Sequence, residues 1–426
     1  MTQTNSYLGK PKEDSPFEQE IFFDQQLTIF SPKGIRVTER LLLNQLPKII
    51  PNSSAPLKVL ILNSAEGLIP GALFFLTQKW SNPPLIHAFY SDIFNFKKAQ
   101  ENFQLSQISG IECSIAAEPF PDQEELFDLV LLPFQHTIEV DLAREWIVRA
   151  THLLKMKGKL WLSVDSRKKS QLEAIVHRCF KTVTLDPQRL GKIWMAEKNK
   201  KDTPPNLAGF SPYTVKEGEQ ILTFRSKSGV FAHGRIDQGT RALLKVLEVK
   251  PEETILDLGC GAGELGIIAA LRSPNSKVVL TDASARAIQS AQLNAETLIP
   301  SRYRVVLSSD IGKEELPEKF SLILTNPPYF SHYRISQRFL ESIKKLLSPE
   351  GRFYLVTKQS DWHWDTIHSN FHLETEFVLM GYSVFVATLQ SPEKASALSL
   401  ASSEEEEGLP LTSSEEEEEE EEVELP

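Results

Sequence analysis

The chain has 426 residues, enough for two or three domains, and its formal net charge of −11 becomes +2 once thirteen glutamates after residue 403 are set aside. Its three cysteines, Cys113, Cys179 and Cys260, have no CxxC spacing, which argues against a disulfide framework or a zinc site and fits a reducing compartment. No apolar run approaches the length of a membrane helix and residues 1–16 lack the apolar core of a signal peptide, so we expect a cytoplasmic protein.

In chain order, residues 1–25 are polar and predict an N-terminal extension. A buried strand is predicted over 58–62, and the residues that follow it are small and polar up to Gly67. A basic, Pro-bearing linker begins at 198, and alternation over 213–226 predicts a hairpin before residue 229. The Ser- and Glu-rich tail, 396–426, cannot bury enough apolar surface to fold, and we expect it to be disordered.

The predicted elements occur twice in the same order. Four blocks of the first half correspond to four blocks of the second half: 58–67 to 254–263, 88–100 to 280–292, 127–134 to 320–327, and 153–158 to 346–351. Four matches in one order indicate an internal duplication. We therefore predict the α/β class, with two tandem Rossmann-like domains over 26–197 and 229–395.

The strongest motif lies in the second copy, where an apolar strand over 254–258 ends in a glycine-rich loop. An acid and three glycines alternate there, at Asp257, Gly259, Gly261 and Gly263, and an Ala-rich helix is predicted next. Glycine has no Cβ and tolerates positive φ, so such a loop lets the backbone approach a nucleotide-like ligand closely. The spacing resembles motif I of class I S-adenosyl-L-methionine (SAM) methyltransferases, which implies SAM as the cofactor.

Two further acids follow predicted strands of the second copy. Asp282 lies roughly 20 residues after the glycine loop, where nucleotide-binding folds place an acid that accepts hydrogen bonds from ribose hydroxyls. The alternative for Asp282 is an ordinary N-cap of the next helix. Asp310 follows the third strand, and the methyltransferase resemblance implies that it accepts a hydrogen bond from the adenine amino group.

The first copy lacks these residues. Its counterparts of Asp257, Gly259, Gly261, Asp282 and Asn326 are Ile61, Asn63, Ala65, Tyr90 and Pro133. Side chains in place of the glycines block a close approach of the backbone to a cofactor. We therefore predict that the N-terminal copy is degenerate and does not bind the cofactor.

The sequence Asn326-Pro327-Pro328-Tyr329 follows the apolar strand over 322–325. The prolines end the strand and remove two backbone donors, which leaves carbonyl oxygens as acceptors. If the Asn326 amide oxygen and the Pro327 carbonyl accept the two hydrogens of a planar amino group, its lone pair turns out of the ring plane toward the methyl donor. Catalysis is then mainly positioning, and Tyr329 stacks on the base. A turn without a catalytic role is the alternative.

A segment before the glycine-rich loop indicates which methyltransferases the chain resembles most. Residues 229–244 resemble the Gly-Val-Phe…Asp-x-Gly-Ser/Thr…Leu-Leu segment of the two-domain rRNA guanine-N2 methyltransferases, which also carry a degenerate domain before an active one. The resemblance implies that Phe231 and Asp237, with Gly239 and Thr240, close over the cofactor or the target base. A helix-capping turn is the alternative for these residues. The sequence also departs from the family, because Tyr329 stands in place of a phenylalanine and the histidine expected directly after it lies at His332.

The resemblance thus implies SAM-dependent methylation of a guanine amino group in ribosomal RNA. Ribosomal RNA or a ribosomal subunit is the expected partner, and we expect a monomer that uses no metal and no membrane. Methylation of a protein glutamine is an alternative, since a glutamine amide fits the same two acceptors. A non-catalytic RNA-binding or ribosome-assembly module is another, although the intact Asp257, Gly259, Gly261, Gly263 and Asn326 argue against it.

Overall fold

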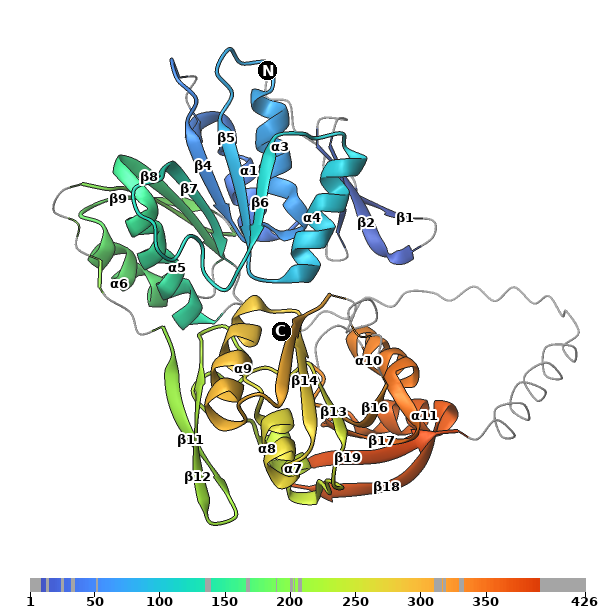
Figure 1. Ribbon diagram of the computed structural model, residues 1–426. Helices are drawn as coiled ribbons and strands as arrows, with labels where there is room; N and C mark the ends of the chain where they lie inside the picture. Colours follow the sequence, from blue (N-terminus) through green and yellow to red (C-terminus); the bar gives the residue numbers. More distant parts are fainter. Residues whose placement is uncertain are drawn as a thin grey trace, which may run out of the picture.

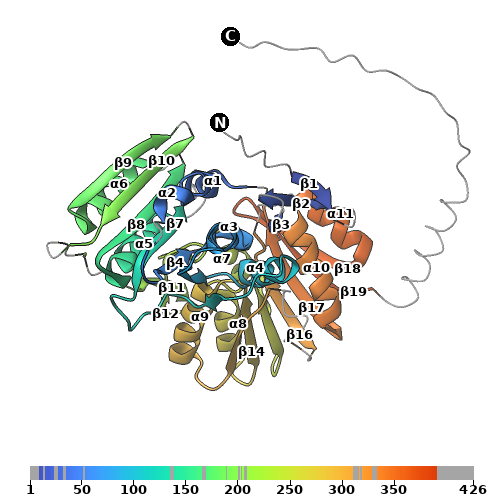
Figure 2. The ribbon, with the colours of Figure 1, turned by 90° about the horizontal axis from the view of Figure 1, so that it is seen from above.

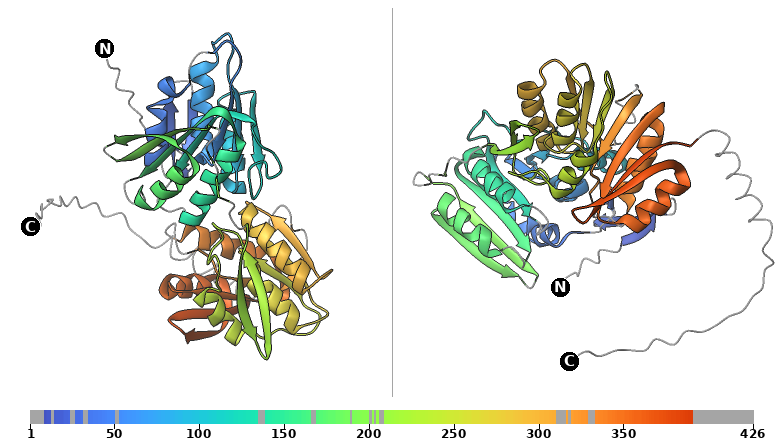
Figure 3. Two further views of the ribbon diagram at one scale, coloured as in Figure 1. Left: turned by 90° about the vertical axis from the view of Figure 1, so that its left-hand side faces the viewer. Right: turned by 90° about the horizontal axis from the view of Figure 1, so that it is seen from below.

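The computed structural model describes residues 9–12, 15–23, 27–31, 35–50, 53–134, 139–165, 169–188, 190–199, 202, 204–205, 209–309, 316, 319–328 and 333–390. Two α/β units lie one above the other (Figures 1 and 3). The predicted site residues Asp310 and Tyr329, and the tail 396–426, lie outside the described residues. No helix in the described part of the chain is long and apolar enough to span a membrane.

The N-terminal unit, residues 37–197, contains a seven-stranded sheet. Its strands are β4 (Lys58–Leu62), β5 (Leu85–Tyr90), β6 (Ile111–Ile115), β7 (Phe127–Phe134), β8 (Leu154–Asp165), β9 (Thr182–Gln188) and β10 (Gly191–Glu197). Its α-helices are α1 (Val37–Leu43), α2 (Leu46–Ile49), α3 (Leu68–Thr77), α4 (Ile93–Leu105), α5 (Val140–Leu153) and α6 (Lys169–Cys179). The strands β1 (Gly9–Lys12), β2 (Ser15–Phe23) and β3 (Leu27–Ser31) form a separate antiparallel sheet that includes part of the predicted extension.

The C-terminal unit, residues 211–389, begins with the predicted hairpin, β11 (Ser211–Glu217) and β12 (Gln220–Ser226). Its main sheet consists of β13 (Thr254–Leu258), β14 (Lys277–Asp282), β15 (Tyr303–Leu307), β16 (Phe320–Thr325), β17 (Leu347–Thr357), β18 (Phe371–Leu379) and β19 (Tyr382–Leu389). Its helices are α7 (Gln238–Val246), α8 (Glu264–Arg272), α9 (Ala285–Leu298), α10 (Arg334–Leu346) and α11 (Ser360–Asn370).

The two large sheets have the same strand order. It is β6-β5-β4-β7-β8-β10-β9 in the first unit and β15-β14-β13-β16-β17-β19-β18 in the second, and in both the penultimate strand is antiparallel to its neighbours. Figure 2 shows the helices packed around these sheets. The predicted fold class, two tandem Rossmann-like domains, is confirmed.

The continuous apolar runs of the central strands are explained by burial on both faces of each sheet. In the C-terminal unit, Ile255 packs with residues of α7, α8 and α9, whereas its neighbour Leu256 packs with residues of α10 and α11. Successive strand residues point to opposite faces, so both must be apolar. The layers hold the strand ends rigidly, and the site is built on those ends.

Equivalent positions of the two units also make equivalent hydrogen bonds. Two pairs illustrate this: Asn63 N to Phe89 O at 2.8 Å with Gly259 N to Thr281 O at 2.9 Å, and Asn102 Nδ2 to Glu66 O with Asn294 Nδ2 to Ala262 O, both at 2.9 Å. The repeat seen in the sequence therefore extends to the turn after the first strand of each sheet and to the helix that supports it.

Candidate active site

The glycine-rich loop after β13 has the conformation that its composition predicts. Gly259, Gly261 and Gly263 have φ values of +75°, +56° and +90°, which residues with a Cβ rarely adopt. A Cβ built on Gly261 would meet no other atom within 4 Å, so this side of the loop is open. Gly263 is the N-cap of α8. The loop thus presents bare backbone beside a helix N-terminus, which favours a nucleotide-like ligand.

Asp257 lies beneath this loop with only 1% of its surface exposed. Its Oδ2 accepts a hydrogen bond from Gly266 N at 2.8 Å, and no partner is found for its Oδ1 among the described residues. Burial raises the pKa of Asp257 to about 8. Burial also raises the pKa of Glu264 to about 7, although its Oε1 accepts a hydrogen bond from Tyr213 Oη at 2.5 Å. The acids under the loop therefore favour a cation nearby.

Asp282 ends β14 and faces the same loop. Its Oδ2 accepts from Gly261 N at 3.0 Å, and its Oδ1 accepts from Ser284 N at 2.8 Å. Burial raises its pKa to about 6. The N-cap of α9 is Ser284, whose Oγ accepts from Ala287 N at 3.4 Å, so the N-cap alternative for Asp282 is wrong. Asp282 instead ties the end of β14 to the glycine loop.

Asn326 follows β16, and its side chain is held by the start of α7. Its Nδ2 donates to Asp237 Oδ2 at 3.0 Å and to Thr240 Oγ1 at 3.2 Å. Because a carboxylate only accepts hydrogen bonds, the contact with Asp237 identifies the donor end of the amide and fixes its orientation. Asp237 also caps α7, accepting from Gly239 N at 2.7 Å. Pro327 continues directly from Asn326.

Phe231 lies on an exposed turn before α7, with 61% of its surface accessible. The preceding residue, Val230, is buried and packs with Ala262 of the glycine loop and Ala287 of α9. The turn is therefore anchored against the loop, and Phe231 projects from it.

The structure brings most of the predicted residues to one edge of the C-terminal sheet. Asp257, Gly259, Gly261, Gly263 and Asp282 form one cluster, Asn326, Asp237 and Thr240 form a second, and Thr325 Oγ1 links their strands by donating to Leu258 O at 2.8 Å. The sequence analysis missed Tyr213 and Glu264. Glu264 had a signal, since it directly follows Gly263, but Tyr213 lies in a distant hairpin and had none.

The open side of Gly261, the positive φ values and the buried acids fit a cofactor that combines a nucleoside with a cationic group. The N-terminal unit also has positive φ values in this turn, at Asn63 and Gly67, but it differs at the positions of Gly261 and Asp282. There, Ala65 and Tyr90 are buried at the positions of Gly261 and Asp282, and a Cβ on Gly67 would lie 2.7 Å from the Phe103 ring. Side chains fill the space that the C-terminal unit leaves open.

The fold of the chain is similar to that of a known methyltransferase. The chain is similar to the T. Thermophilus 16S rRNA N2 G1207 methyltransferase solved with AdoMet and guanosine, with a TM-score of 0.69 and 20% identity over 88% of this chain and 98% of that one. Both units therefore have the class I methyltransferase fold. Within the chain, residues 221–380 match the methyltransferase small domain family.

Curated relatives match part of the chain. The ribosomal RNA small subunit methyltransferase C of Ectopseudomonas mendocina is 33% identical over 177 residues, which are 40% of this chain and 53% of that protein. The protein of the same name from Pseudoalteromonas atlantica is 35% identical over 150 residues, which are 34% of this chain and 43% of that protein. The chain thus spans about half the length of the curated relatives it matches.

Proposed function

We propose that the protein is a SAM-dependent methyltransferase that modifies the exocyclic N2 amino group of a guanine in ribosomal RNA. The observation that carries the proposal is the fixed amide of Asn326. Asp237 holds its Nδ2 at 3.0 Å, and we propose that its oxygen and the Pro327 carbonyl act as the acceptors at the sheet edge that carries the glycine loop.

The residues of the C-terminal unit would hold the cofactor as follows. The backbone of Gly259, Gly261 and Gly263 borders it, Asp282 accepts hydrogen bonds from the ribose, and Asp310 is the predicted acceptor for the adenine amino group. When bound, SAM supplies an electrophilic methyl group on its sulfonium sulfur. One cofactor is expected per chain, because the N-terminal counterparts of Gly261 and Asp282 are buried side chains.

The amino group of guanine is a poor nucleophile because its lone pair is delocalised into the ring. The Asn326 oxygen and the Pro327 carbonyl accept its two hydrogens and favour a pyramidal nitrogen, whose lone pair is localised and can face the methyl group. After the transfer the methylated nitrogen releases one proton to solvent. Positioning of this kind is worth up to roughly 7–11 kcal/mol. Tyr329 and Phe231 offer aromatic faces for the unstacked base, each worth about 1–3 kcal/mol, which offsets the few kcal/mol that flipping the base costs.

Ribosomal RNA is proposed as the substrate because the curated relatives of the chain carry that substrate in their names. We propose further that the protein acts in the cytoplasm, without a metal ion, and as a monomer. Protein glutamine methylation remains the second candidate, because a glutamine side-chain amide presents the same two hydrogens to Asn326 and Pro327.

One experiment separates these candidates. Cells lacking the protein and matched wild-type cells are compared by mass spectrometry of nucleosides from each ribosomal RNA, and the purified protein is then incubated with the undermodified RNA and labelled SAM. Loss and restoration of N2-methylguanosine is the expected result. Labelled N6-methyladenosine, or a labelled protein glutamine with no labelled guanosine, would contradict the proposed substrate.

A further inference from the structure

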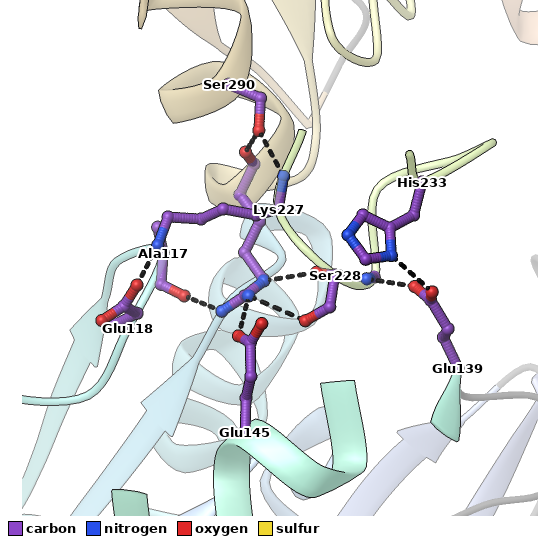
Figure 4. A network of polar contacts seen from close by, with 10 residues as sticks. Ala117, Glu118, Glu139, Glu145, Lys227, Ser228, His233 and Ser290 are labelled. Atoms are coloured by element: carbon purple, nitrogen blue, oxygen red, sulfur yellow. Dashed lines mark hydrogen bonds and ion pairs between the residues drawn. The ribbon is translucent and has the colours of Figure 1, made fainter. Parts of the chain in front are cut away.

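The turn that carries Phe231 is held from the other unit of the chain. Residues 228–234, here called the Phe231 loop, connect the hairpin to α7 and face the start of α5 in the N-terminal unit (Figure 4). Gly229 and Gly234 in this loop have φ values of +79° and +71°, and Ala232 has +56°. The two glycines adopt this conformation readily, but Ala232 is strained in it and needs the surrounding structure to hold it there.

Glu139, the N-cap residue of α5, binds the loop at two points. One carboxylate oxygen accepts from Gly229 N and the other lies 2.9 Å from His233 Nδ1. These two contacts bracket Phe231, so both flanks of the aromatic residue are attached to one carboxylate. Hydrogen bonds to an ionised acceptor are about twice as strong as neutral ones, and a bidentate arrangement adds geometric specificity.

A second carboxylate of α5 acts through a buried arginine. Arg286 of α9, 1% exposed, forms an ion pair with Glu145 and donates to Ala117 O at 2.8 Å, both in the N-terminal unit. The same guanidinium donates to Ser228 O at 2.6 Å and to Ser228 Oγ at 3.0 Å, at the start of the Phe231 loop. The base of the loop is thereby fixed to both units at once (Figure 4).

Packing supports the same arrangement. Glu139, Leu142 and Glu145 are spaced by three and lie on one face of α5. A Cβ built on Gly229 would lie 2.6 Å from Leu142 Cδ2, so the loop backbone approaches α5 as closely as only glycine permits. The φ of +79° favours glycine at 229, and any larger residue would also force the Leu142 side chain to move.

We propose that the degenerate N-terminal unit sets the position of Phe231, with Glu139 as the main positioning residue and Glu145 acting through Arg286. The inference rests on the proposed function, since it assigns to Phe231 the contact with the target base. It gives the duplicated domain a role in substrate engagement that needs no cofactor pocket of its own. RNA binding, rather than cofactor binding, is the step that the N-terminal unit then controls.

The test compares Glu139→Gln with Glu112→Gln in the full-length protein. Glu112 is a matched control, because its Oε2 also lies near a histidine, 3.2 Å from His87 Nδ1, but on the edge strand β6. Glu139→Gln should raise the KM for RNA about tenfold, the loss expected for one charge-assisted hydrogen bond, with the SAM Kd changed less than about twofold. Amide exchange over 229–234 should become faster, and Glu112→Gln should change none of these quantities.

A double variant distinguishes positioning from general stability. Once Phe231→Ala has removed the aromatic ring, adding Glu139→Gln should change the RNA KM by less than about twofold. An equal effect in both backgrounds, or an unchanged KM in the single variant, would overturn the proposal.

Glu139, Asp141 and His233 could also hold a cation, since their ligand atoms lie within 4.8 Å of one another. If EDTA alone reproduced the Glu139→Gln effects in the wild-type protein, a bound ion would hold the loop and the direct contact would be refuted.

Failure of the proposed function is recognised separately. If the wild-type protein transfers no methyl group to ribosomal RNA, that function is wrong, and amide exchange over 229–234 still reports whether Glu139 orders the loop. Unchanged exchange in Glu139→Gln would refute the positioning role whatever the substrate.

Discussion

Asp92 and Ser284 form an isolated antiparallel β-bridge between the two units. Each of them is the N-cap of the helix that follows it in its own unit. Asp92 Oδ1 accepts from Asn95 N at 2.9 Å, and Ser284 Oγ accepts from Ala287 N at 3.4 Å. On either side of the bridge, Ile93 N donates to Ala283 O and Ala285 N donates to Ser91 O, both at 2.9 Å. All of these residues occupy equivalent positions in the repeat.

The two copies therefore meet through the same corner, as the subunits of a two-fold symmetric dimer do. In the C-terminal unit this corner follows β14 and belongs to the cofactor edge, next to Asp282. In the N-terminal unit it follows β5, beside the buried Tyr90. The edge that is proposed to hold the cofactor in one copy corresponds to an interface edge in the other, and contacts made after β6 and β7, by Ala117 and Glu139, extend this interface.

The first prediction concerns this corner. Asp92→Ala removes a capping carboxylate and should lower the free energy of unfolding by about 1 kcal/mol, whereas Asp92→Asn, which can still cap, should change it by only a few tenths. Denaturant unfolding of the full-length protein measures both. The control is Asp122→Asn, an exposed residue of the same unit. Equal losses in Asp92→Ala and Asp92→Asn would show that charge at the interface, and not capping, is what Asp92 contributes.

The second prediction concerns pH and cofactor affinity. Burial raises the pKa of Asp282 to about 6, and both a cationic ligand and ribose hydrogen bonds favour its ionised form. Binding should therefore lower this pKa, so the affinity for SAM rises as the pH increases through about 6. Between pH 7.5 and pH 5 the Kd should weaken by about tenfold, corresponding to one pH unit below the pKa. Calorimetry on the wild type and on Asp282→Asn measures the SAM Kd at both pH values. A variant whose Kd weakens between pH 7.5 and pH 5 as much as that of the wild type would contradict the prediction.

A third prediction concerns stability without cofactor. Burial raises the folded-state pKa of Asp257 to about 8, far above that of an unfolded aspartate. The folded state then keeps a proton that the unfolded state releases, so this residue costs stability as the pH rises from about 4 to about 8. Asp257→Asn cannot ionise and can still accept from Gly266 N. Its Tm should exceed that of the wild type by a few degrees at pH 8 and by less at pH 5. A variant less stable at pH 8 would show that the charged form is favoured in the fold.

The sequence predicted the class of fold and the duplication because these depend on local signals. Apolar strands, the glycine loop and the prolines after Asn326 each impose a conformation on the residues around them. The anchoring of the Phe231 loop was not predictable. It depends on single charged residues far apart in the chain, Glu139 with His233 and Arg286 with Glu145, which have no period and no motif.

The role of Asp237 was predictable only in part. The family resemblance implied that Asp237 closes over the cofactor or the target base. Its place before Gly239 and Thr240 also suggested a capping turn. The structure adds its contact with Asn326, 89 residues away, which neither pattern contains. One carboxylate thus caps a helix and orients the amide that is proposed to bind the target.

The final prediction follows from this pair. Asn326→Ala removes the acceptor and should abolish methyl transfer, while the SAM Kd stays within about threefold, because the amide faces the target amino group. The same Oδ2 of Asp237 accepts from Gly239 N and from Asn326 Nδ2, so Asp237→Asn can keep both contacts but loses the negative charge, and the amide of Asn326 is held less firmly. The kcat of this variant should fall about 10- to 100-fold, the range for one misplaced group in a positioning mechanism. Single-turnover kinetics with saturating RNA and SAM measure the transfer step directly.

The cap-removing variant Asp237→Ala should lose stability as well, by about 1 kcal/mol, whereas Asp237→Asn should not. If Asp237→Asn transferred methyl groups at the wild-type rate, the orientation of Asn326 would not depend on Asp237.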